Sequence, residues 1–227
     1  MMNDEQKVIQ INLGMVNAYL IKSKKPILVD TGLRGSVGKI LKKISSEGIN
    51  PKDISLIVIT HAHSDHTGSL KELKDATGAK VAVGKTDSDY LAHGMNFPVY
   101  SKKIFFKIIA SFLPRISMKE GINADIVISS ETDLSEYGIP GKIIPTPGHT
   151  QGSLSVVLDS GEAIVGDLFS GGFIRKKKLS YPHFICNQRL VEESIKKIIS
   201  LNPKIVYTGH GGPFEIDVVR KKFMFSS

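Results

Sequence analysis

Four ionisable side chains follow directly behind the apolar run ISLIVIT of residues 54–60, namely His61, His63, Asp65 and His66. An apolar run bounded by polar residues is typical of a strand that is buried on both faces. Desolvated imidazoles and carboxylates each need a hydrogen bond, a countercharge or a metal ion, and a metal ion satisfies them together. The spacing His-x-His-x-Asp-His on a loop lets His61 and His63 point to one position, while Asp65 and His66 point to a neighbouring one. The cluster therefore indicates two adjacent ions.

Three distant motifs offer further ligands of the same kind. His149 lies in IPTPGHTQGSLSVV, Asp167 in AIVGDLFSGG and His210 in IVYTGHGGP. Each of the three follows an apolar run and has a neighbouring glycine, which allows the backbone to turn sharply toward a common centre. Five of the seven histidines of the chain fall in these motifs and the first cluster. A polar surface loop would not predict such partners.

The order of the predicted elements favours a layered α/β domain with two facing sheets over a doubly wound sheet. Helices are predicted over about 36–47, stopped by Gly48, over 69–76, stopped by Gly78, and over 189–200. Residues 85–119 look like a helical insertion that carries several phenylalanines. Four roles are open for these phenylalanines, namely a lid, a subunit contact, a face resting on lipid headgroups and ordinary packing against the sandwich. Strands are predicted over 7–14, 17–23, 25–32, 54–60, 79–84, 124–130, 141–146, 153–159, 161–166 and 204–209.

Length and composition restrict the remaining possibilities. The 227 residues suffice for one large domain, and we expect a single domain over 1–227. The net charge of +8 is spread along the chain, which favours a solvated lysine-rich surface over a nucleic-acid site. The chain has a single cysteine, Cys186, and its start has no apolar h-region, and both features predict a cytoplasmic protein. No apolar run reaches about 18 residues, so no membrane span is expected.

Taken together and in this order, the motifs LVDTG (28–32), THAHSDHTG (60–68), PTPGHTQGS (145–153), GDLF (166–169) and TGHGGP (208–213) resemble those of the metallo-β-lactamase superfamily of metal-dependent hydrolases. The resemblance spans almost the whole chain. It implies a four-layer αβ/βα sandwich of two facing mixed β-sheets, with the site at one edge of the sheets.

The resemblance also implies a role for each motif residue. His61, His63 and His149 would hold one ion, Asp65, His66 and His210 the other, and Asp167 would bridge the two. Asp30 would support the site without binding metal. Cys186 lacks the setting of the cysteine ligand found in some β-lactamases of this fold, and we expect it to be a small buried apolar group. The all His/Asp set is similar to that of glyoxalase II-like thioesterases and lactonases.

These ligands suit zinc by default, and also iron or manganese. The expected reaction is attack of a metal-bridging hydroxide on a small ester, thioester or lactone, with Asp65 as an additional catalytic residue. Of the two histidines outside the motifs, His183 is the better candidate for substrate contact and His93 is expected on the surface. The cluster Arg175 to Lys178 is expected to be a solvated turn. The alternative is that it binds a carboxylate or phosphate group of the substrate.

Two other enzymatic functions remain open at this stage. One is an iron-dependent oxidoreductase, similar to persulfide dioxygenases, that uses only the His61, His63 and Asp167 side. The other is a nuclease or phosphodiesterase, for which the motifs of the RNA-processing branches are missing. The short tail after His210 also lacks the C-terminal helical domain of glyoxalase II. We therefore expect a small-molecule substrate, no nucleic acid and a possible homodimer.

Overall fold

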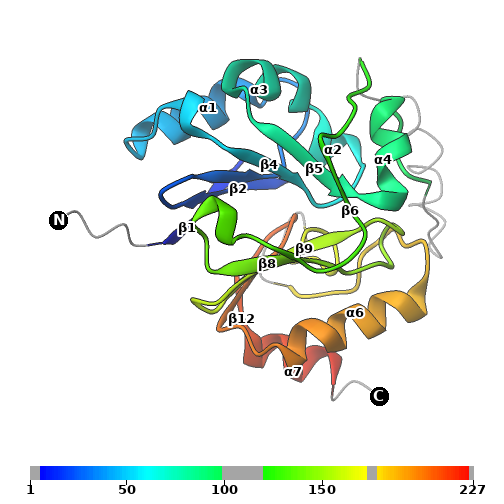
Figure 1. Ribbon diagram of the computed structural model, residues 1–227. Coiled ribbons are helices and arrows are strands. Elements are labelled where there is room, and N and C mark those ends of the chain that lie inside the picture. Colours follow the sequence, from blue (N-terminus) through cyan, green and yellow to red (C-terminus); the bar gives the residue numbers. More distant parts are fainter. Residues whose placement is uncertain (1–5, 99–119, 173–177, 225–227) are drawn as a thin grey trace.

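The computed structural model describes residues 6–98, 120–172 and 178–224. Within these residues, the strands form two six-stranded sheets that face each other, with helices on both outer sides (Figure 1). Both sheets are mixed. In the first, the successive pairs β3–β4, β4–β5 and β5–β6 are parallel, and in the second the pair β10–β11 is parallel. All other neighbouring strands are antiparallel. This arrangement confirms the predicted four-layer sandwich of two facing mixed sheets.

The strands of the first sheet are, in spatial order, β1 (Lys7–Asn12), β2 (Asn17–Lys22), β3 (Ile27–Val29), β4 (Leu56–Ile59), β5 (Lys80–Gly84) and β6 (Ile126–Ile128). Those of the second are β12 (Phe214–Glu215), β11 (Ile205–Tyr207), β10 (Glu162–Ile164), β9 (Leu154–Leu158), β8 (Gly141–Pro145) and β7 (Thr132–Asp133). The helices are α1 (Val37–Ser46), α2 (Ser64–Thr67), α3 (Leu70–Thr77), α4 (Lys85–Ala92), α6 (Gln188–Ser200) and α7 (Ile216–Phe223), with short 3-10 helices η1 (Pro51–Asp53) and η3 (Ser135–Tyr137).

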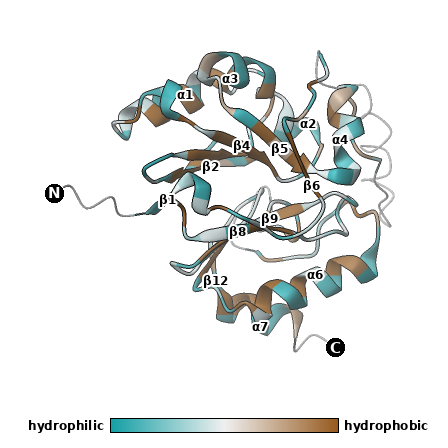
Figure 2. Cartoon of the chain, viewed as in Figure 1, coloured by the Kyte–Doolittle hydropathy of each residue, from teal (hydrophilic) through white to brown (hydrophobic). Residues whose placement is uncertain are grey.

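The inner strands are buried on both faces, and their side chains divide between two apolar layers. In β2, Ala18 and Leu20 pack under α1 and α3, whereas Tyr19 and Ile21 face the second sheet. This division follows from the two-residue period of a strand. A third apolar layer lies between the second sheet and helices α6 and α7. Figure 2 shows the result as apolar strands in the middle and helices with one polar side.

Glycines end the two helices that the sequence predicts in the first half. The backbone of Gly78 is left-handed (φ 75°), and its N–H donates to the carbonyl of Lys74 at the end of α3. Gly48, after α1, has a φ of 76°. Only glycine adopts this conformation without a steric cost. The predicted strands of both sheets are likewise confirmed within a few residues.

Several elements differ from the prediction. Asp65 and His66 lie on the short helix α2 and not on a loop, and α7 and the two-residue strands β7 and β12 were not expected. Of the predicted insertion at 85–119, residues 85–92 form helix α4 and Phe97 is buried, while residues 99–119 lie outside the described residues. Of the cluster Arg175 to Lys178, only Lys178 is described.

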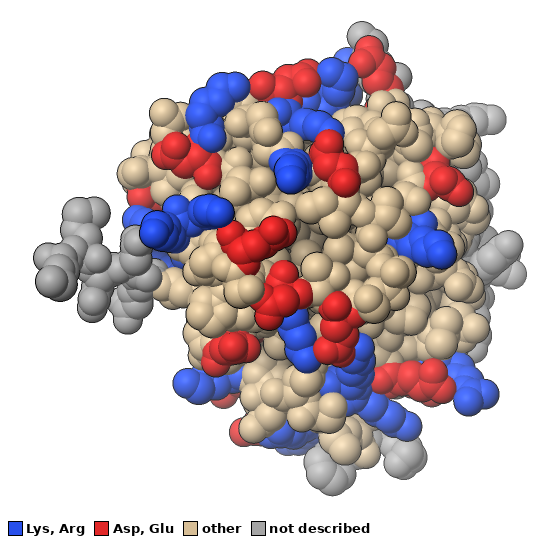
Figure 3. All heavy atoms as spheres, in the orientation of Figure 1, with Lys and Arg blue, Asp and Glu red and all other residues tan. Residues whose placement is uncertain are grey.

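The surface agrees with a solvated distribution of charge. On the face that Figure 3 shows, acidic side chains lie among the lysines and arginines over both halves of the sandwich. Within residues 6–98, 120–172 and 178–224, no helix combines the length and the apolar character that a membrane crossing requires.

Candidate metal centre

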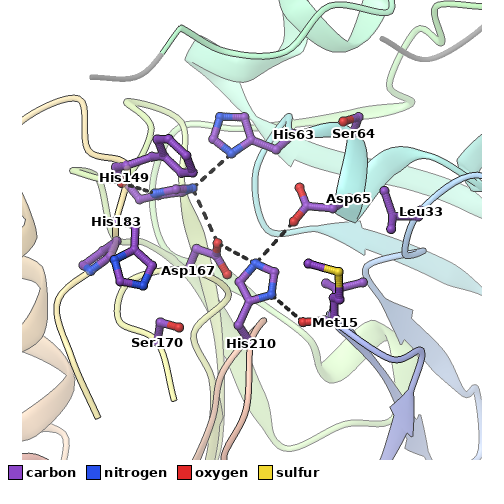
Figure 4. A pocket seen from close by; sticks show the side chains of 13 residues that line it. Met15, Leu33, His63, Ser64, Asp65, His149, Asp167, Ser170, His183 and His210 are labelled. Carbon is purple, nitrogen blue, oxygen red and sulfur yellow. Dashed lines mark hydrogen bonds and ion pairs between the residues drawn. The ribbon is translucent and has the colours of Figure 1, made fainter. Parts of the chain in front are cut away.

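The seven predicted ligands lie together at one edge of the two sheets, although four separate strands deliver them. His61, His63, Asp65 and His66 follow β4 of the first sheet. His149, Asp167 and His210 follow β8, β10 and β11 of the second sheet. Figure 4 shows five of these side chains converging from different segments on one pocket. The structure thus brings together every side chain that the sequence analysis placed in the site.

The first group consists of three buried imidazoles. Ligand atoms of His61, His63 and His149 all lie within 4.8 Å of one another. Nε2 of His63 donates to the carbonyl of Phe97 (3.0 Å), and Nδ1 of His149 donates to the carbonyl of Phe184 (2.7 Å). These bonds fix the tautomers, because a carbonyl oxygen only accepts. The remaining nitrogens of His63 and His149 therefore face each other as lone pairs, 3.0 Å apart.

The second group lies next to the first and includes two carboxylates. Atoms of Asp65, His66 and His210 lie within 4.8 Å of one another, as do those of His61, His66 and Asp167. Nε2 of His210 lies 3.2 Å from Oδ2 of Asp65 and 3.1 Å from Oδ2 of Asp167. Asp167 also reaches the other group, because its Oδ2 lies 3.8 Å from Nε2 of His149. Its carboxylate thus lies between the two groups.

A chain of hydrogen bonds orients the second group from behind. Oδ2 of Asp30 accepts from Nδ1 of His66 and from the hydroxyl of Thr60, both at 2.8 Å. Because the Thr60 hydroxyl already donates to Asp30, it accepts from Nδ1 of His61 at 3.0 Å. Asp30 is buried, with 1% of its surface exposed. Its role as a support that binds no metal stays a prediction.

Unpaired buried atoms test whether these residues suit a metal. Within the described residues, Nε2 of His61, Nε2 of His66 and Oδ1 of Asp167 are buried and have no hydrogen-bond partner, although Nε2 of His66 lies 3.5 Å from Oδ1 of Asp167 as an ion pair. Such atoms are costly in a protein interior unless a cation is bound. Gly209 keeps the space open, since a β-carbon there would lie 2.6 Å from Cε1 of His66 and closer still to Asp167. The donor set therefore fits divalent cations that accept nitrogen and oxygen ligands.

Burial and charge divide the histidines into two classes. Burial lowers the pKa of His63 to about 3 and also lowers the pKa values of His61 and His149. Burial also opposes the imidazolium of His66, but the carboxylates of Asp30, Asp65 and Asp167 outweigh it and raise its pKa to about 9. The first group is thus neutral and ready to bind a cation. In the second group, a cation has to displace a proton.

The carboxylates and His210 complete this picture. Although burial raises the pKa of a carboxyl group, the neighbouring His66 and His210 hold the pKa values of Asp65 and Asp167 well below the usual range. Burial opposes the imidazolium of His210 too, and Asp167 and Asp65 together raise its pKa. Both carboxylates are therefore ionised and available as oxygen ligands at neutral pH.

Strand β2 of the first sheet positions His210 on the second. The side-chain amide of Asn17 donates to the carbonyls of Thr208 (3.1 Å) and Gly211 (2.9 Å), which flank His210. The hydroxyl of Tyr19 donates to the same Thr208 carbonyl at 2.7 Å. Nδ1 of His210 donates to the carbonyl of Met15 at 2.7 Å. The last ligand is thus fixed by the sheet opposite to its own.

A pocket of about 200 Å³ opens over the two groups. Apolar side chains form much of its wall, with Met15 61% and Leu33 39% exposed. Ser64, Ser170 and His183 supply polar groups, and no lysine or arginine lines the pocket within the described part of the chain. Its lining residues are Met15, Val16, Leu33, His63, Ser64, Asp65, His149, Asp167, Ser170, Pro182, His183, Phe184 and His210.

The residues outside the motifs occupy the places that their sequence context suggested, with one exception. His183 lines the pocket, and His93 is exposed at the end of α4. Cys186 belongs to none of the candidate metal groups of the described residues, but it is half-buried and not fully buried as expected. Its backbone N–H donates to the carbonyls of Gly148 and His149, which keeps it at the edge of the His149 turn.

Sequence reasoning missed the supporting residues Asn17, Tyr19 and Thr60, and it missed the burial of Asp87. The only signal for Thr60 is its place between the apolar strand and His61. Asp87 lies in the first turn of α4, where acidic residues are common on exposed surfaces, yet it is fully buried. The carbonyl partners of the histidines carry no signal at all, because every residue has a carbonyl.

Comparisons with known proteins agree with this architecture. Residues 11–210 match the sequence profile of the Metallo-beta-lactamase superfamily. A probable metallo-hydrolase of Methanocaldococcus jannaschii is 30% identical over 207 residues, which cover 86% of this chain and 87% of that protein. The probable metallo-hydrolase YflN of Bacillus subtilis is 26% identical over 221 residues, covering 89% and 83%. A crystal structure of a superfamily protein from Sulfolobus tokodaii has the same fold, with a TM-score of 0.70, 24% identity and coverage of 97% and 86%.

Proposed function

The chain belongs to the metallo-beta-lactamase superfamily, and we propose that it is a dinuclear metal-dependent hydrolase of small esters, thioesters or lactones. The relatives named as probable metallo-hydrolases support the enzyme class. The observation that carries the dinuclear proposal is the set of inward-facing ring nitrogens in two adjacent groups, with Asp167 between them. His61, His63 and His149 would hold one ion and Asp65, His66 and His210 the other.

Two divalent cations, with zinc as the first choice, would supply a hydroxide nucleophile at neutral pH and would polarise the scissile carbonyl. The residues of the chain provide the rest. Asp65 lines the pocket, and 32% of its side chain is exposed, so its carboxylate is placed to accept and return a proton. Its Oδ2 lies 3.2 Å from Nε2 of His210. His183 and Ser170 line the same pocket and offer hydrogen bonds to the substrate oxygen.

The character of the pocket supports an uncharged substrate. Met15, Val16, Leu33 and Phe184 offer apolar contact to an acyl chain or a lactone ring. The described lining residues include neither lysine nor arginine, so beside the two metal ions a phosphodiester would gain no cationic side chain. The second group, with Asp65 and His210, favours a hydrolase over an oxidoreductase that would use only the His61, His63 and Asp167 side.

Metal analysis and a substrate screen on one preparation test this proposal. We expect two divalent ions per chain and hydrolysis of p-nitrophenyl esters, thioesters or lactones. Activity on bis(p-nitrophenyl) phosphate and on β-lactams should be much lower. A protein that contains a single iron and consumes oxygen with a persulfide substrate would contradict the proposal.

A further inference from the structure

We propose that Asp87 is a positioning residue that holds the His149 turn of one sheet against the His61–His63 loop of the other. The inference rests on the proposed two-metal function, because it concerns the group of three histidines. Those histidines come from strands β4 and β8, which belong to different sheets. Their geometry therefore depends on whatever joins the two loops near the ligands.

The Asp87 carboxylate makes that connection with both of its oxygens. Oδ2 accepts from the backbone N–H of Ala62, which lies between His61 and His63, at 2.8 Å. The same oxygen accepts from the hydroxyl of Thr150 at 2.9 Å. Oδ1 accepts from the backbone N–H of Gly152 at 2.8 Å. One carboxylate thus binds the middle of the first ligand loop and both sides of the turn that follows His149.

The neighbouring glycines are fitted to this carboxylate. A β-carbon on Gly152 would collide with Oδ1 of Asp87 and lie 2.6 Å from its backbone nitrogen. A β-carbon on Gly84, at the start of α4, would collide with the carbonyl of Gly152. Both positions therefore need glycine for the helix start and the His149 turn to approach each other. The side chain of Asp87 is fully buried in the resulting contact.

Within the described residues, the two ligand segments also meet at His63 and His149 themselves, whose facing ring nitrogens are 3.0 Å apart, and at a backbone hydrogen bond. The backbone N–H of Leu154 donates to the carbonyl of Thr60 at 2.8 Å, which joins the two strands at their ends. The hydroxyl of Thr150 also pairs with Ser153, but that contact stays within its own turn. Asp87 is accordingly the side chain that sets the distance between the two ligand-bearing segments.

A carboxylate is required at position 87 because all three partners donate. In Asp87→Asn, the shape of the side chain is kept, but its NH2 group must face the N–H of either Gly152 or Ala62. Either orientation places two donors against each other and leaves a buried backbone N–H unpaired. The variant should therefore loosen the three-histidine group without enlarging any cavity.

Zinc titration against a chromophoric chelator tests the proposal without relying on activity. We expect the wild-type protein to bind two zinc ions, and Asp87→Asn to bind one of them about 10- to 100-fold more weakly, as is common when a supporting residue of a metal ligand is changed. The cobalt-substituted protein should show the change in its visible spectrum. Ile44→Ala, a buried change on helix α1, is the control for general destabilisation.

The outcomes separate the two claims. Wild-type affinity at both ions in Asp87→Asn, or an equal loss in Ile44→Ala, would overturn the role of Asp87 and leave the proposed function intact. A wild-type protein that binds fewer than two ions would contradict both. If Asp87→Asn does not fold, the comparison of Thr150→Val with Thr150→Ser decides: weaker zinc binding in the valine variant alone supports the proposal, and equal binding overturns it.

Discussion

Asp30 and His66 form a buried pair in which Nδ1 of the imidazole lies 2.8 Å from Oδ2 of the carboxylate. The backbone of Asp30 is left-handed, with a φ of 62°, which is uncommon for a residue other than glycine. The turn aims the carboxylate at Thr60 and His66 together. A strained residue at the end of a strand is thus connected to the orientation of two predicted ligands.

Asp30→Asn should weaken metal binding and the fold together. Its amide group would face one of the donors that the carboxylate now accepts, so we expect a loss of about 1–3 kcal/mol in the free energy of unfolding. The affinity for metal should fall about 10- to 100-fold. Chemical denaturation of the metal-free protein and zinc titration measure the two effects, and a variant that matches wild type in both would contradict the role of Asp30.

The same variant gives a prediction for pH. In the metal-free protein the pKa of His66 is raised to about 9, against 6.5 in an unfolded chain, so the folded state binds the proton more tightly. The contribution to stability is complete below pH 6.5 and is lost as the pH rises toward 9. The stability difference between wild type and Asp30→Asn should therefore shrink over this range. A difference that stays constant from pH 6 to pH 9 would show that Asp30 does not stabilise the imidazolium.

Asp167→Ala should remove metal and activity together, because the carboxylate lies between both groups of ligands. Elemental analysis of the purified variant and its turnover of an ester substrate give the answer. Asp159→Ala, a change of an exposed carboxylate at the end of β9, serves as the matched control and should behave as wild type. Full metal content with unchanged turnover in Asp167→Ala would refute the bridging assignment.

His183→Ala should change catalysis without changing metal content. Its side chain lines the pocket but belongs to none of the candidate ligand groups in the described residues. We expect kcat/KM to fall about 100- to 1000-fold, which is the effect of losing one hydrogen bond to the reacting oxygen. His93→Ala, at an exposed position, is the control. Equal kinetics for the two variants would remove His183 from the site.

Leu33→Ala should alter selectivity for the acyl chain. Leu33 lines the pocket and is 39% exposed, so its truncation should change stability by less than about 1 kcal/mol. A lost apolar contact should lower kcat/KM for a butyrate ester by about 10-fold more than for an acetate ester. Steady-state kinetics with p-nitrophenyl acetate and butyrate measure the ratio, and an unchanged ratio would place the acyl chain elsewhere.

The architecture was predictable because the inner strands consist of apolar residues on both faces. Such runs as residues 54–60 leave few alternatives to a strand covered on both sides. Short elements carried less signal. Helix α2 has four residues, and α7 buries only Ile216 and Val219, so neither shows the repeated apolar positions by which longer helices are recognised.

The predicted ligands also carried more signal in the sequence than the residues that support them. Histidine is rare in this chain, so five histidines at strand ends were conspicuous, and the resemblance to a known family added Asp30 and the bridging role of Asp167. Asp87 is one of 22 acidic residues, and only the packing of Gly84 and Gly152 makes its burial necessary. The carbonyls of Met15, Phe97 and Phe184 orient three histidines through backbone atoms, which no residue pattern encodes.

A crystal structure of the zinc-loaded protein, with anomalous data at the zinc edge, tests the dinuclear site most directly. Two peaks are expected, one among His61, His63 and His149, the other among Asp65, His66 and His210, with Asp167 touching both. One peak alone, or peaks outside these side chains, would contradict the account.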